Sequence, residues 1–257
     1  MLLRYALRLD RTQLYARLSE EISPAGRTAF EALLARRLRR EPTAYIIGRR
    51  EFYGLELDVT PAAPIPRPET ELLVDETLAQ ARRLRHAYRG PHIVDVGTGC
   101  GAIALALAIR LPVARVTAID TSQDALDLAR HNAERLGVSG RVRFVLGDLL
   151  PPLPEVADII VANLPYVPSG EWERLAPEIR CYEPRTALDG GPDGLRLIAR
   201  LLKEAPAHVR SRGALILEIG HDQGALVAAR ARQAFPAAAI AVKNDLAGLD
   251  RAVIVET

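Results

Sequence analysis

The chain has 257 residues, of which 49% are hydrophobic and 26% are charged, so it can bury a sizeable core and shows no compositional sign of disorder. Its 34 basic residues nearly balance 32 acidic ones, and the net charge of +2 excludes a global field for binding polyanions. The two cysteines and five histidines form neither a disulfide framework nor a pattern with metal-ligand spacing, so we expect no metal site.

The N-terminal region is richer in basic residues than the rest. Residues 1–50 contain eleven arginines, an excess that can touch RNA or an RNA-bound partner, although a solvated helix face explains it equally well. Arg4, Arg8 and Arg11 interrupt the apolar start, and no run approaches transmembrane length. We therefore expect a cytoplasmic protein without membrane contact.

The first 60 residues predict a small helical unit followed by a hairpin. Leucine and alanine recur every three or four positions over residues 1–40, which predicts helices with a break at Ser23-Pro24. Residues 45–60 carry short apolar runs with Gly48 and Gly54 as turns, which predicts a short hairpin. Four prolines between positions 61 and 68 then form a stiff linker, so we place a boundary near residues 60–67.

Beyond the linker, strands and helices alternate. Strands are predicted at 92–96, 115–120, 141–146, 157–162, 214–218, 239–243 and 251–255, with helices at 69–83, 101–110, 122–136, 193–206 and 222–234. Apolar strands that alternate with helices indicate a mostly parallel sheet covered on both faces. The last two strands are too close for a helical crossover, so we expect an antiparallel hairpin at that end.

A glycine-rich loop, residues 95–102 with the sequence Asp-Val-Gly-Thr-Gly-Cys-Gly-Ala, joins the first sheet strand to its helix. Glycines at such a loop let the backbone approach a ligand closely. The spacing of Gly97, Gly99 and Ala102 also satisfies a dinucleotide fingerprint, with Asp120 at a distance suited to a ribose. The loop alone therefore leaves a nicotinamide cofactor and S-adenosylmethionine open.

Acidic residues follow three consecutive strands and favour S-adenosylmethionine. Asp95 precedes the glycines, where an anion opposes a pyrophosphate but suits an ammonium and a sulfonium group. Asp120 can bind both ribose hydroxyls, and Asp148 can read the adenine amino group beside the apolar wall of Leu149. Helix capping explains any one of these residues equally well, but all three together favour a cationic nucleoside.

The tetrapeptide Asn163-Leu164-Pro165-Tyr166 follows a buried apolar strand, at the edge where open α/β sheets bind ligands. Pro165 restricts Leu164 to an extended conformation and so fixes the direction of its carbonyl. Asn163 Oδ1 and that carbonyl can accept both hydrogens of an –NH2 group, with Tyr166 packed on its plane. The acceptors would aim the nitrogen for in-line displacement and favour the positive charge that develops on it. A plain strand-ending turn with a core tyrosine is the alternative.

This order of motifs resembles the class I S-adenosylmethionine-dependent amino-methyltransferases, which implies a Rossmann-like seven-stranded fold. Further segments resemble the HemK/PrmC family, and the resemblance runs from about residue 41 to the end. They are Arg-Glu-Phe-Tyr-Gly at 50–54, Ile-Pro-Arg-Pro-Glu-Thr-Glu at 65–71, Tyr-Glu-Pro-Arg-Thr-Ala-Leu-Asp-Gly-Gly at 182–191 and Asp-Leu-Ala-Gly at 245–248. The resemblance implies methylation of the N5 amide nitrogen of the glutamine in the Gly-Gly-Gln motif of peptide chain release factors. It also implies a substrate-docking domain at 1–60 and a methyltransferase domain at 61–257.

Carried over by position, the family's functional residues fall on the motifs above. The implied cofactor contacts are Gly97, Thr98, Gly99, Cys100, Gly101, Asp120, Asp148, Leu149 and Asn163. The implied catalytic and substrate contacts are Asn163, Leu164, Pro165 and Tyr166. Arg67 and Glu69 are expected to shape the entrance over the cofactor or to form an ion pair within the linker.

Two departures from the family pattern leave alternatives open. Leu164 stands where the family usually has a proline, and the resulting tetrapeptide also occurs in ribosomal RNA adenine dimethyltransferases. Adenine N6-methylation of RNA or DNA is therefore an alternative function. A nicotinamide-dependent oxidoreductase and a non-catalytic cofactor-binding module are two further alternatives. The helical N-terminal region also begins later than the family's, so we expect either a late start codon or a trimmed docking module.

Overall fold

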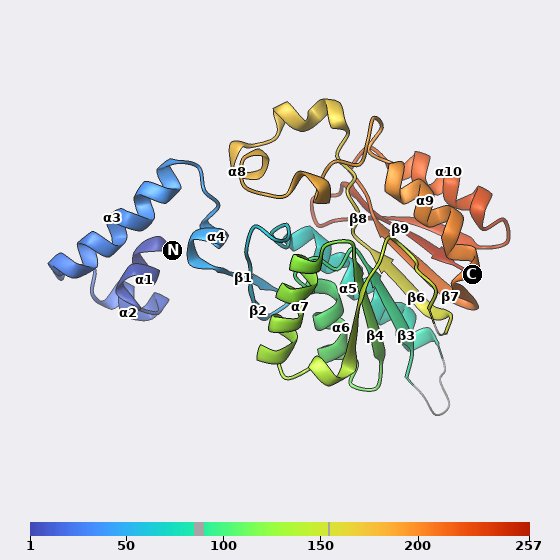
Figure 1. The fold of residues 1–257 in the computed structure, drawn as a ribbon, viewed down its shortest axis with the longest axis horizontal. Coiled ribbons are helices and arrows are strands. Elements are labelled where there is room, and N and C mark those ends of the chain that lie inside the picture. Colours follow the sequence, from blue (N-terminus) through green and yellow to red (C-terminus); the bar gives the residue numbers. More distant parts are fainter. Residues whose placement is uncertain (85–89, 154) are drawn as a thin grey trace.

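The computed structural model describes residues 1–84, 90–153 and 155–257, which leaves His86 outside the described residues. A seven-stranded sheet forms the centre of the larger part of the molecule, and the N-terminal helices stand to one side of it (Figure 1).

The N-terminal region is helical, as predicted, and contains α1 (Leu2–Leu7), α2 (Arg11–Ala16) and α3 (Pro24–Leu38). Asp10 and Gln13 form a capping box at the start of α2, and the Ser23 hydroxyl accepts the Gly26 N–H at 3.2 Å to cap α3. No side chain of these three helices, all within the described part of the chain, is fully buried. Their apolar residues therefore remain available for contacts.

Residues 45–47 differ from the prediction, because they belong to a short helix, α4 (Thr43–Ile47), and not to the hairpin. Gly48 ends this helix with a φ of 78°, and Tyr45 is buried with its hydroxyl donating to the Ala63 carbonyl at 2.8 Å. Packing against the linker thus overrides the strand preference of the apolar run. The hairpin consists of β1 (Arg49–Phe52) and β2 (Leu55–Asp58), which pair antiparallel.

The central sheet contains the seven predicted strands in the predicted directions, although the strand predicted at 214–218 begins at Val209. Its order is β5-β4-β3-β6-β7-β9-β8, in which the first five are parallel and β9 pairs antiparallel with both β7 and β8. The strands are β3 (His92–Val96), β4 (Arg115–Asp120), β5 (Val142–Leu146), β6 (Ala157–Ala162), β7 (Val209–Glu218), β8 (Ala239–Asn244) and β9 (Asp250–Glu256). Val96 pairs with Ile119 and with Ala162, which in turn pairs with Leu217. The segments after these four strands therefore leave the sheet side by side.

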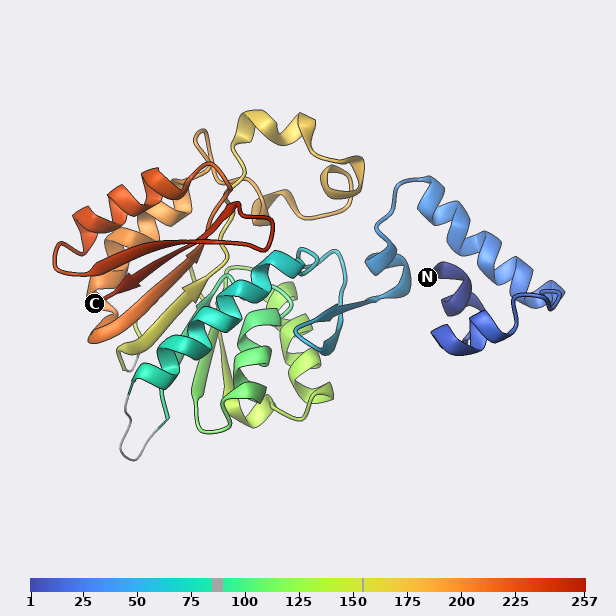
Figure 2. The same ribbon diagram turned by 180° about the vertical axis from the view of Figure 1, so that it is seen from behind.

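Helices cover both faces of the sheet (Figures 1 and 2). One face carries α5 (Glu71–Arg83), α6 (Ala102–Arg110) and α7 (Gln123–Arg135), and the other carries α9 (Arg196–Glu204) and α10 (Gly224–Ala234). Helix α6 is apolar on nearly all sides, and it is therefore buried between the sheet and its neighbouring helices. No helix within the described residues is long and apolar enough to cross a membrane.

The segment after β6, which we call the 167–191 loop, contains three short helical turns that the sequence pattern did not predict. They are the 3₁₀ turns Ser169–Arg174 and Arg185–Ala187 and the helix α8 (Pro177–Arg180). Glu178 in this loop pairs with Arg37 at 2.7 Å and Arg40 at 3.3 Å, and the Tyr182 hydroxyl donates to the Arg39 carbonyl at 2.6 Å. The end of α3 is therefore attached to the loop that follows the tetrapeptide.

Candidate active site

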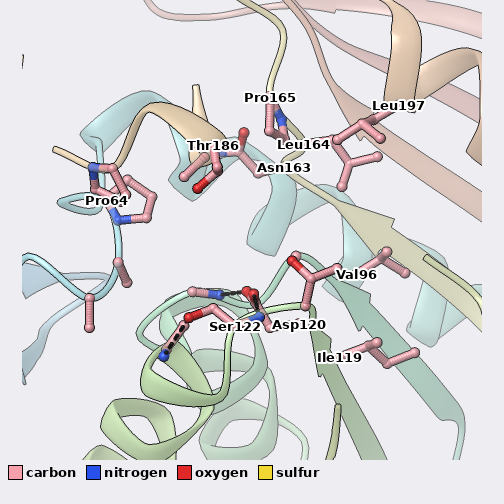
Figure 3. A pocket seen from close by; sticks show the side chains of 18 of the residues that line it. Pro64, Val96, Ile119, Asp120, Ser122, Asn163, Leu164, Pro165, Thr186 and Leu197 are labelled. Atoms are coloured by element: carbon pink, nitrogen blue, oxygen red, sulfur yellow. Dashed lines mark hydrogen bonds between the residues drawn. The ribbon is translucent and has the colours of Figure 1, made fainter. Parts of the chain in front are cut away.

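Two cavities adjoin at the C-terminal edge of the parallel strands, with volumes of about 320 and 120 Å³. In the first cavity, Asp120 and Ser122 lie on one side and Asn163 and Leu164 on the opposite side (Figure 3). The residues that line both cavities are Pro64, Gly97, Gly99, Asn163, Leu164, Pro165 and Ala187. The glycine loop and the tetrapeptide therefore form the junction of the two spaces.

The glycines of the loop serve two different purposes. Gly97, Gly99 and Gly101 have φ angles of 77°, 56° and 87°, which favour glycine. Gly97 and Gly99 line both cavities, and a Cβ at Gly97 would lie 3.2 Å from Leu164. Gly101 lines neither cavity, and a Cβ there would lie 3.2 Å from Ala129 of α7. Gly101 therefore permits helix packing and does not face the ligand space.

Asp95 and Thr98 stabilise the loop from within. Asp95 Oδ2 accepts the Thr98 hydroxyl at 2.7 Å and the Ala104 N–H at 3.1 Å, and burial raises the pKa of Asp95 to about 7. Asp95 lines neither cavity, so it caps the loop and the start of α6 instead of facing the cationic groups of a cofactor as expected. Thr98 and Cys100 line the second cavity only.

Asp120 lies at the end of β4 and lines the first cavity. Its Oδ2 accepts the Gly99 N–H and its Oδ1 accepts the Ser122 N–H, both at 2.9 Å. These bonds fix the carboxylate between the glycine loop and α7, while each oxygen retains a lone pair for a ligand. The position suits the ribose contact predicted for this residue.

Asp148 and Leu149 also line the first cavity. Asp148 Oδ2 accepts from Arg200 at 2.9 Å, which leaves Oδ1 for a ligand. Leu149 is 4% exposed and has a φ of 53°, a backbone conformation that is strained for a residue with a branched side chain. In this conformation Leu149 forms part of the lining of the first cavity and gives it an apolar surface.

The tetrapeptide presents two free hydrogen-bond acceptors. Asn163 Nδ2 donates to the Thr70 hydroxyl oxygen at 3.1 Å, and no described residue donates to Asn163 Oδ1 or to the Leu164 carbonyl. Tyr166 lines the second cavity. The two atoms predicted to hold an –NH2 group are therefore both available at the junction of the cavities.

The tetrapeptide is held from behind by segments far away in the sequence. Gln223 Nε2 donates to the Tyr166 carbonyl at 2.9 Å, and the Gly190 N–H donates to the Val167 carbonyl at 2.8 Å. A Cβ at Gly190 would lie 2.6 Å from the Pro165 carbonyl oxygen, so only glycine fits this approach. This explains why the loop has a glycine at position 190.

Sequence reasoning missed Thr70 and Glu218, which line the second cavity. Glu218 ends β7, is 1% exposed, and accepts the Tyr166 hydroxyl at 3.2 Å. Burial raises the pKa of Glu218 to about 7 and also raises the pKa of Tyr166. The sequence contained a signal for Glu218, because an acidic residue directly follows the apolar run 214–217. Asp120 lies at the end of its strand in the same way.

Arg67 and Glu69 were expected to shape the entrance over the cofactor or to pair with each other, but the structure separates their roles. Arg67 forms an ion pair with Glu183 of the 167–191 loop and lines the second cavity, whereas Glu69 is exposed. The other oxygen of Glu183 accepts the Ile65 N–H at 3.2 Å. The contacts of Glu183 therefore tie the linker to the loop beside the second cavity, where Ile65 and Arg67 lie.

Comparisons with known proteins identify the family. Residues 1–48 match the PrmC N-terminal domain, and residues 93–182 match a methyltransferase domain. The chain is 44% identical over 252 residues to the release factor glutamine methyltransferase of Moorella thermoacetica, a match that covers 98% of this chain and 87% of that protein. It is also 44% identical over 227 residues to that of Geobacter sulfurreducens, with coverage of 88% and 77%. The chain belongs to the release factor glutamine methyltransferase family.

Solved structures agree with the fold of this family member. The catalytic domain of hMettl16 in complex with an RNA hairpin gives a TM-score of 0.61 at 16% identity and covers 79% of this chain and 76% of that one. A methyltransferase from Pyrococcus furiosus gives 0.58 at 18% identity, with coverage of 88% and 98%. At such identities the likeness shows the fold alone, and it confirms the predicted class I methyltransferase fold.

As a member of the release factor glutamine methyltransferase family, the protein is an enzyme with S-adenosylmethionine as methyl donor. The first cavity fits this cofactor, because glycines without side chains, the Asp120 carboxylate and the apolar Leu149 converge on it. Family membership excludes the nicotinamide-dependent oxidoreductase and the non-catalytic module. Across the described ranges, no group of three or more His, Cys, Asp or Glu side chains could hold a metal ion.

Proposed function

We propose that this enzyme transfers a methyl group from S-adenosylmethionine to the N5 amide nitrogen of the glutamine in the Gly-Gly-Gln motif of peptide chain release factors. The observation that carries this proposal is the pair of free acceptors, Asn163 Oδ1 and the Leu164 carbonyl, at the junction of the two cavities. The names of its relatives support glutamine as the acceptor.

The first cavity would hold the cofactor through residues of three strand ends. The Asp120 carboxylate binds the ribose hydroxyls, and Gly97 and Gly99 allow the backbone to approach the amino-acid part. Asp148 Oδ1 accepts a hydrogen bond from the adenine amino group, because Arg200 donates only to Oδ2. Leu149 packs on the base. When bound, the cofactor supplies an electrophilic methyl carbon.

The acceptor amide is oriented by the tetrapeptide. Asn163 Oδ1 and the Leu164 carbonyl accept the two amide hydrogens and aim the nitrogen for in-line attack. The bond from nitrogen to the methyl carbon forms as the bond from sulfur to that carbon breaks, and its electron pair stays on sulfur. The two acceptors stabilise the positive charge that develops on nitrogen, which then releases a proton to water. No side-chain base is required.

Residues 1–60 would form the docking domain for the release factor, and residues 61–257 the methyltransferase domain. Apolar side chains of the N-terminal region stay exposed, among them Tyr15 at 62%, Leu18 at 67% and Leu38 at 75%, and such surfaces suit a protein partner. Arg37 and Arg40 are already paired with Glu178, which supports a structural role for part of the basic excess. The remaining arginines could contact RNA incidentally. We place the reaction in the cytoplasm, where release factors act.

Adenine N6-methylation of RNA or DNA is the second candidate. The observation in its favour is Leu164, because with leucine at this position the tetrapeptide resembles that of ribosomal RNA adenine dimethyltransferases. The two acceptors would hold the adenine amino group in the same way as an amide.

The test offers methyl-labelled cofactor to a release factor, ribosomal RNA and DNA side by side. We expect label in the release factor only. A release factor with alanine in place of the Gly-Gly-Gln glutamine serves as the matched control and should remain unlabelled. Label in RNA or DNA without label in the release factor would establish the second candidate instead.

A further inference from the structure

Glu218 occupies an unusual position beside the tetrapeptide. It ends β7 directly after Leu217, which pairs with Ala162 of β6, so Glu218 and Asn163 leave neighbouring strands at the same level of the sheet. It lines the second cavity together with Asn163, Thr70 and Tyr166, although it is only 1% exposed. Carboxylates are almost never buried to this extent unless they are paired.

No cation forms a direct ion pair with this buried carboxylate in the part of the chain that the structure describes. Among the described residues, Glu218 forms no salt bridge, and Arg251, whose charge acts on it, is paired with Asp245 at 3.1 Å. Oε1 accepts the Tyr166 hydroxyl at 3.2 Å, whereas the buried Oε2 has no hydrogen-bond partner in the described part of the chain. Burial of such a group lowers the stability of the folded protein, which points to a role other than stabilising the fold.

Thr70 connects Glu218 with Asn163. Thr70, Asn163 and Glu218 all line the second cavity, and the Thr70 oxygen accepts Asn163 Nδ2 at 3.1 Å. The Thr70 hydroxyl lies close enough to the Glu218 carboxylate to favour its charged form. A hydroxyl has only one proton to donate. If that proton is directed to Glu218, the Thr70 oxygen can only accept, and the NH2 side of Asn163 must face it.

We propose that Glu218 is a positioning residue for methyl transfer, which holds Tyr166 directly and, through Thr70, fixes the amide orientation in which Asn163 presents its oxygen to the acceptor nitrogen. Without the carboxylate, Thr70 can donate to Asn163 Oδ1 and the amide can turn. Asn163 would then offer an NH2 group to the NH2 group of the substrate, and neither could accept from the other. This inference rests on the proposed function only in its choice of acceptor, because any –NH2 acceptor needs the same orientation.

The kinetic test replaces Glu218 by Gln, which retains size but adds a donor. We expect the kcat of Glu218→Gln to fall about 10- to 100-fold, the loss of one oriented acceptor, with KM for the release factor and cofactor affinity unchanged. Thr70→Val should show a similar loss, Thr70→Ser should retain activity, and the double variant Glu218→Gln/Thr70→Val should be no worse than the more impaired single variant. Glu69→Gln, which removes an exposed neighbouring charge, is the matched control.

A second readout does not depend on turnover. The side-chain NH2 resonances of Asn163, assigned by their loss in Asn163→Ala, should shift in Glu218→Gln and in Thr70→Val but not in Glu69→Gln. Wild-type kcat in Glu218→Gln, strictly additive losses, or unmoved Asn163 resonances would each overturn the proposal. If the wild type methylates adenine in place of glutamine, the proposed substrate fails and the same variants are compared on adenine. Should Glu218→Gln not fold, the Thr70→Val and Thr70→Ser pair decides.

Discussion

Arg67 and Glu183, 116 positions apart in the chain, form an ion pair that joins the proline-rich linker to the 167–191 loop. The Glu183 side chain is 1% exposed, and that of Arg67 is 37% exposed. Residues 61–64 of the linker line the first cavity and residues 64–67 line the second, and Glu183 also accepts the Ile65 N–H. The pair therefore fixes one wall of the site.

Loss of Arg67 should destabilise the protein, because it leaves the Glu183 carboxylate buried without compensation. We expect Arg67→Ala to lower the free energy of unfolding by about 2 kcal/mol, less than for a fully buried pair since Arg67 is partly exposed to solvent. Urea unfolding measures the change. Arg67→Ala/Glu183→Gln should recover part of the loss, and Arg130→Ala, which breaks the exposed pair with Asp127, should change stability little. Equal effects of Arg67→Ala and Arg130→Ala would contradict the assignment.

Asp120 should determine cofactor affinity in two ways, through the ligand and through the glycine loop. Asp120→Ala removes the acceptor of the Gly99 and Ser122 N–H groups, so we expect S-adenosylmethionine to bind about 10- to 100-fold more weakly. Asp120→Asn retains one oxygen acceptor and should lose less. Calorimetric titration compares the two variants. Unchanged affinity of Asp120→Ala would refute the ribose contact.

Most of the fold was predictable from the sequence, because apolar periodicity encodes burial directly. The seven strands of the central sheet, including the final hairpin, follow from this periodicity. Residues 43–47 and the 167–191 loop were not predictable, since their conformations depend on tertiary contacts. Tyr45, for example, is buried against the linker, and Tyr182 bonds to the backbone of α3.

The candidate site was predictable where backbone chemistry determines it, and less so where partners come from distant segments. The glycine loop and the tetrapeptide place Gly97 and Asn163 as the motif spacing indicates. Asp95 turns inward because Thr98 and Ala104 both donate to it, a pairing that the chain order does not reveal. Glu218 lies 55 positions beyond Asn163 in the sequence, and only the register of β6 with β7 brings the two together.

Asn163 should affect catalysis without affecting cofactor binding. Its side-chain oxygen is one of the two free acceptors, so we expect Asn163→Ala to lower kcat about 100- to 1,000-fold, as for loss of a preorganised group at the reacting atoms. Calorimetry should give wild-type affinity for S-adenosylmethionine. Asn244→Ala, on the exposed end of β8, is the matched control and should retain full turnover. Full turnover of Asn163→Ala would reject its role.

Ionisation of Glu218 should make the free energy of unfolding fall and kcat rise as the pH increases. Burial raises its pKa from 4.5 to about 7, with Tyr166, Arg251 and Glu69 as the titratable groups that act on it. The folded state holds this proton more tightly than the unfolded state, so the stabilisation is fully present below about pH 4.5 and is lost as pH rises to about 7. Glu218→Gln should therefore be more stable than the wild type at pH 8, relative to pH 4.5, by up to about 3 kcal/mol.

Turnover requires the charged carboxylate, so the kcat of the wild type should rise through about pH 7, and that of Glu218→Gln should not. The difference between the two proteins isolates Glu218, because Asp95, whose pKa burial also raises, is present in both. Urea unfolding from about pH 4.5 to 9 and initial rates from about pH 5 to 9 provide the two profiles. Parallel profiles for the two proteins would contradict this assignment.

Leu164→Pro should be active, because the direction of the residue 164 carbonyl matters and not the side chain. No described residue accepts the Leu164 N–H, so proline removes no hydrogen bond there, and it makes the peptide more rigid. Leu164 is 5% exposed and packs in the core beside Gly97, so we expect a loss of about 1–2 kcal/mol in stability. Turnover should equal or exceed that of the wild type, whereas Leu164→Ala should lose the packing without gaining rigidity. An inactive Leu164→Pro that still binds S-adenosylmethionine would show that the leucine side chain, and not the carbonyl alone, positions the acceptor.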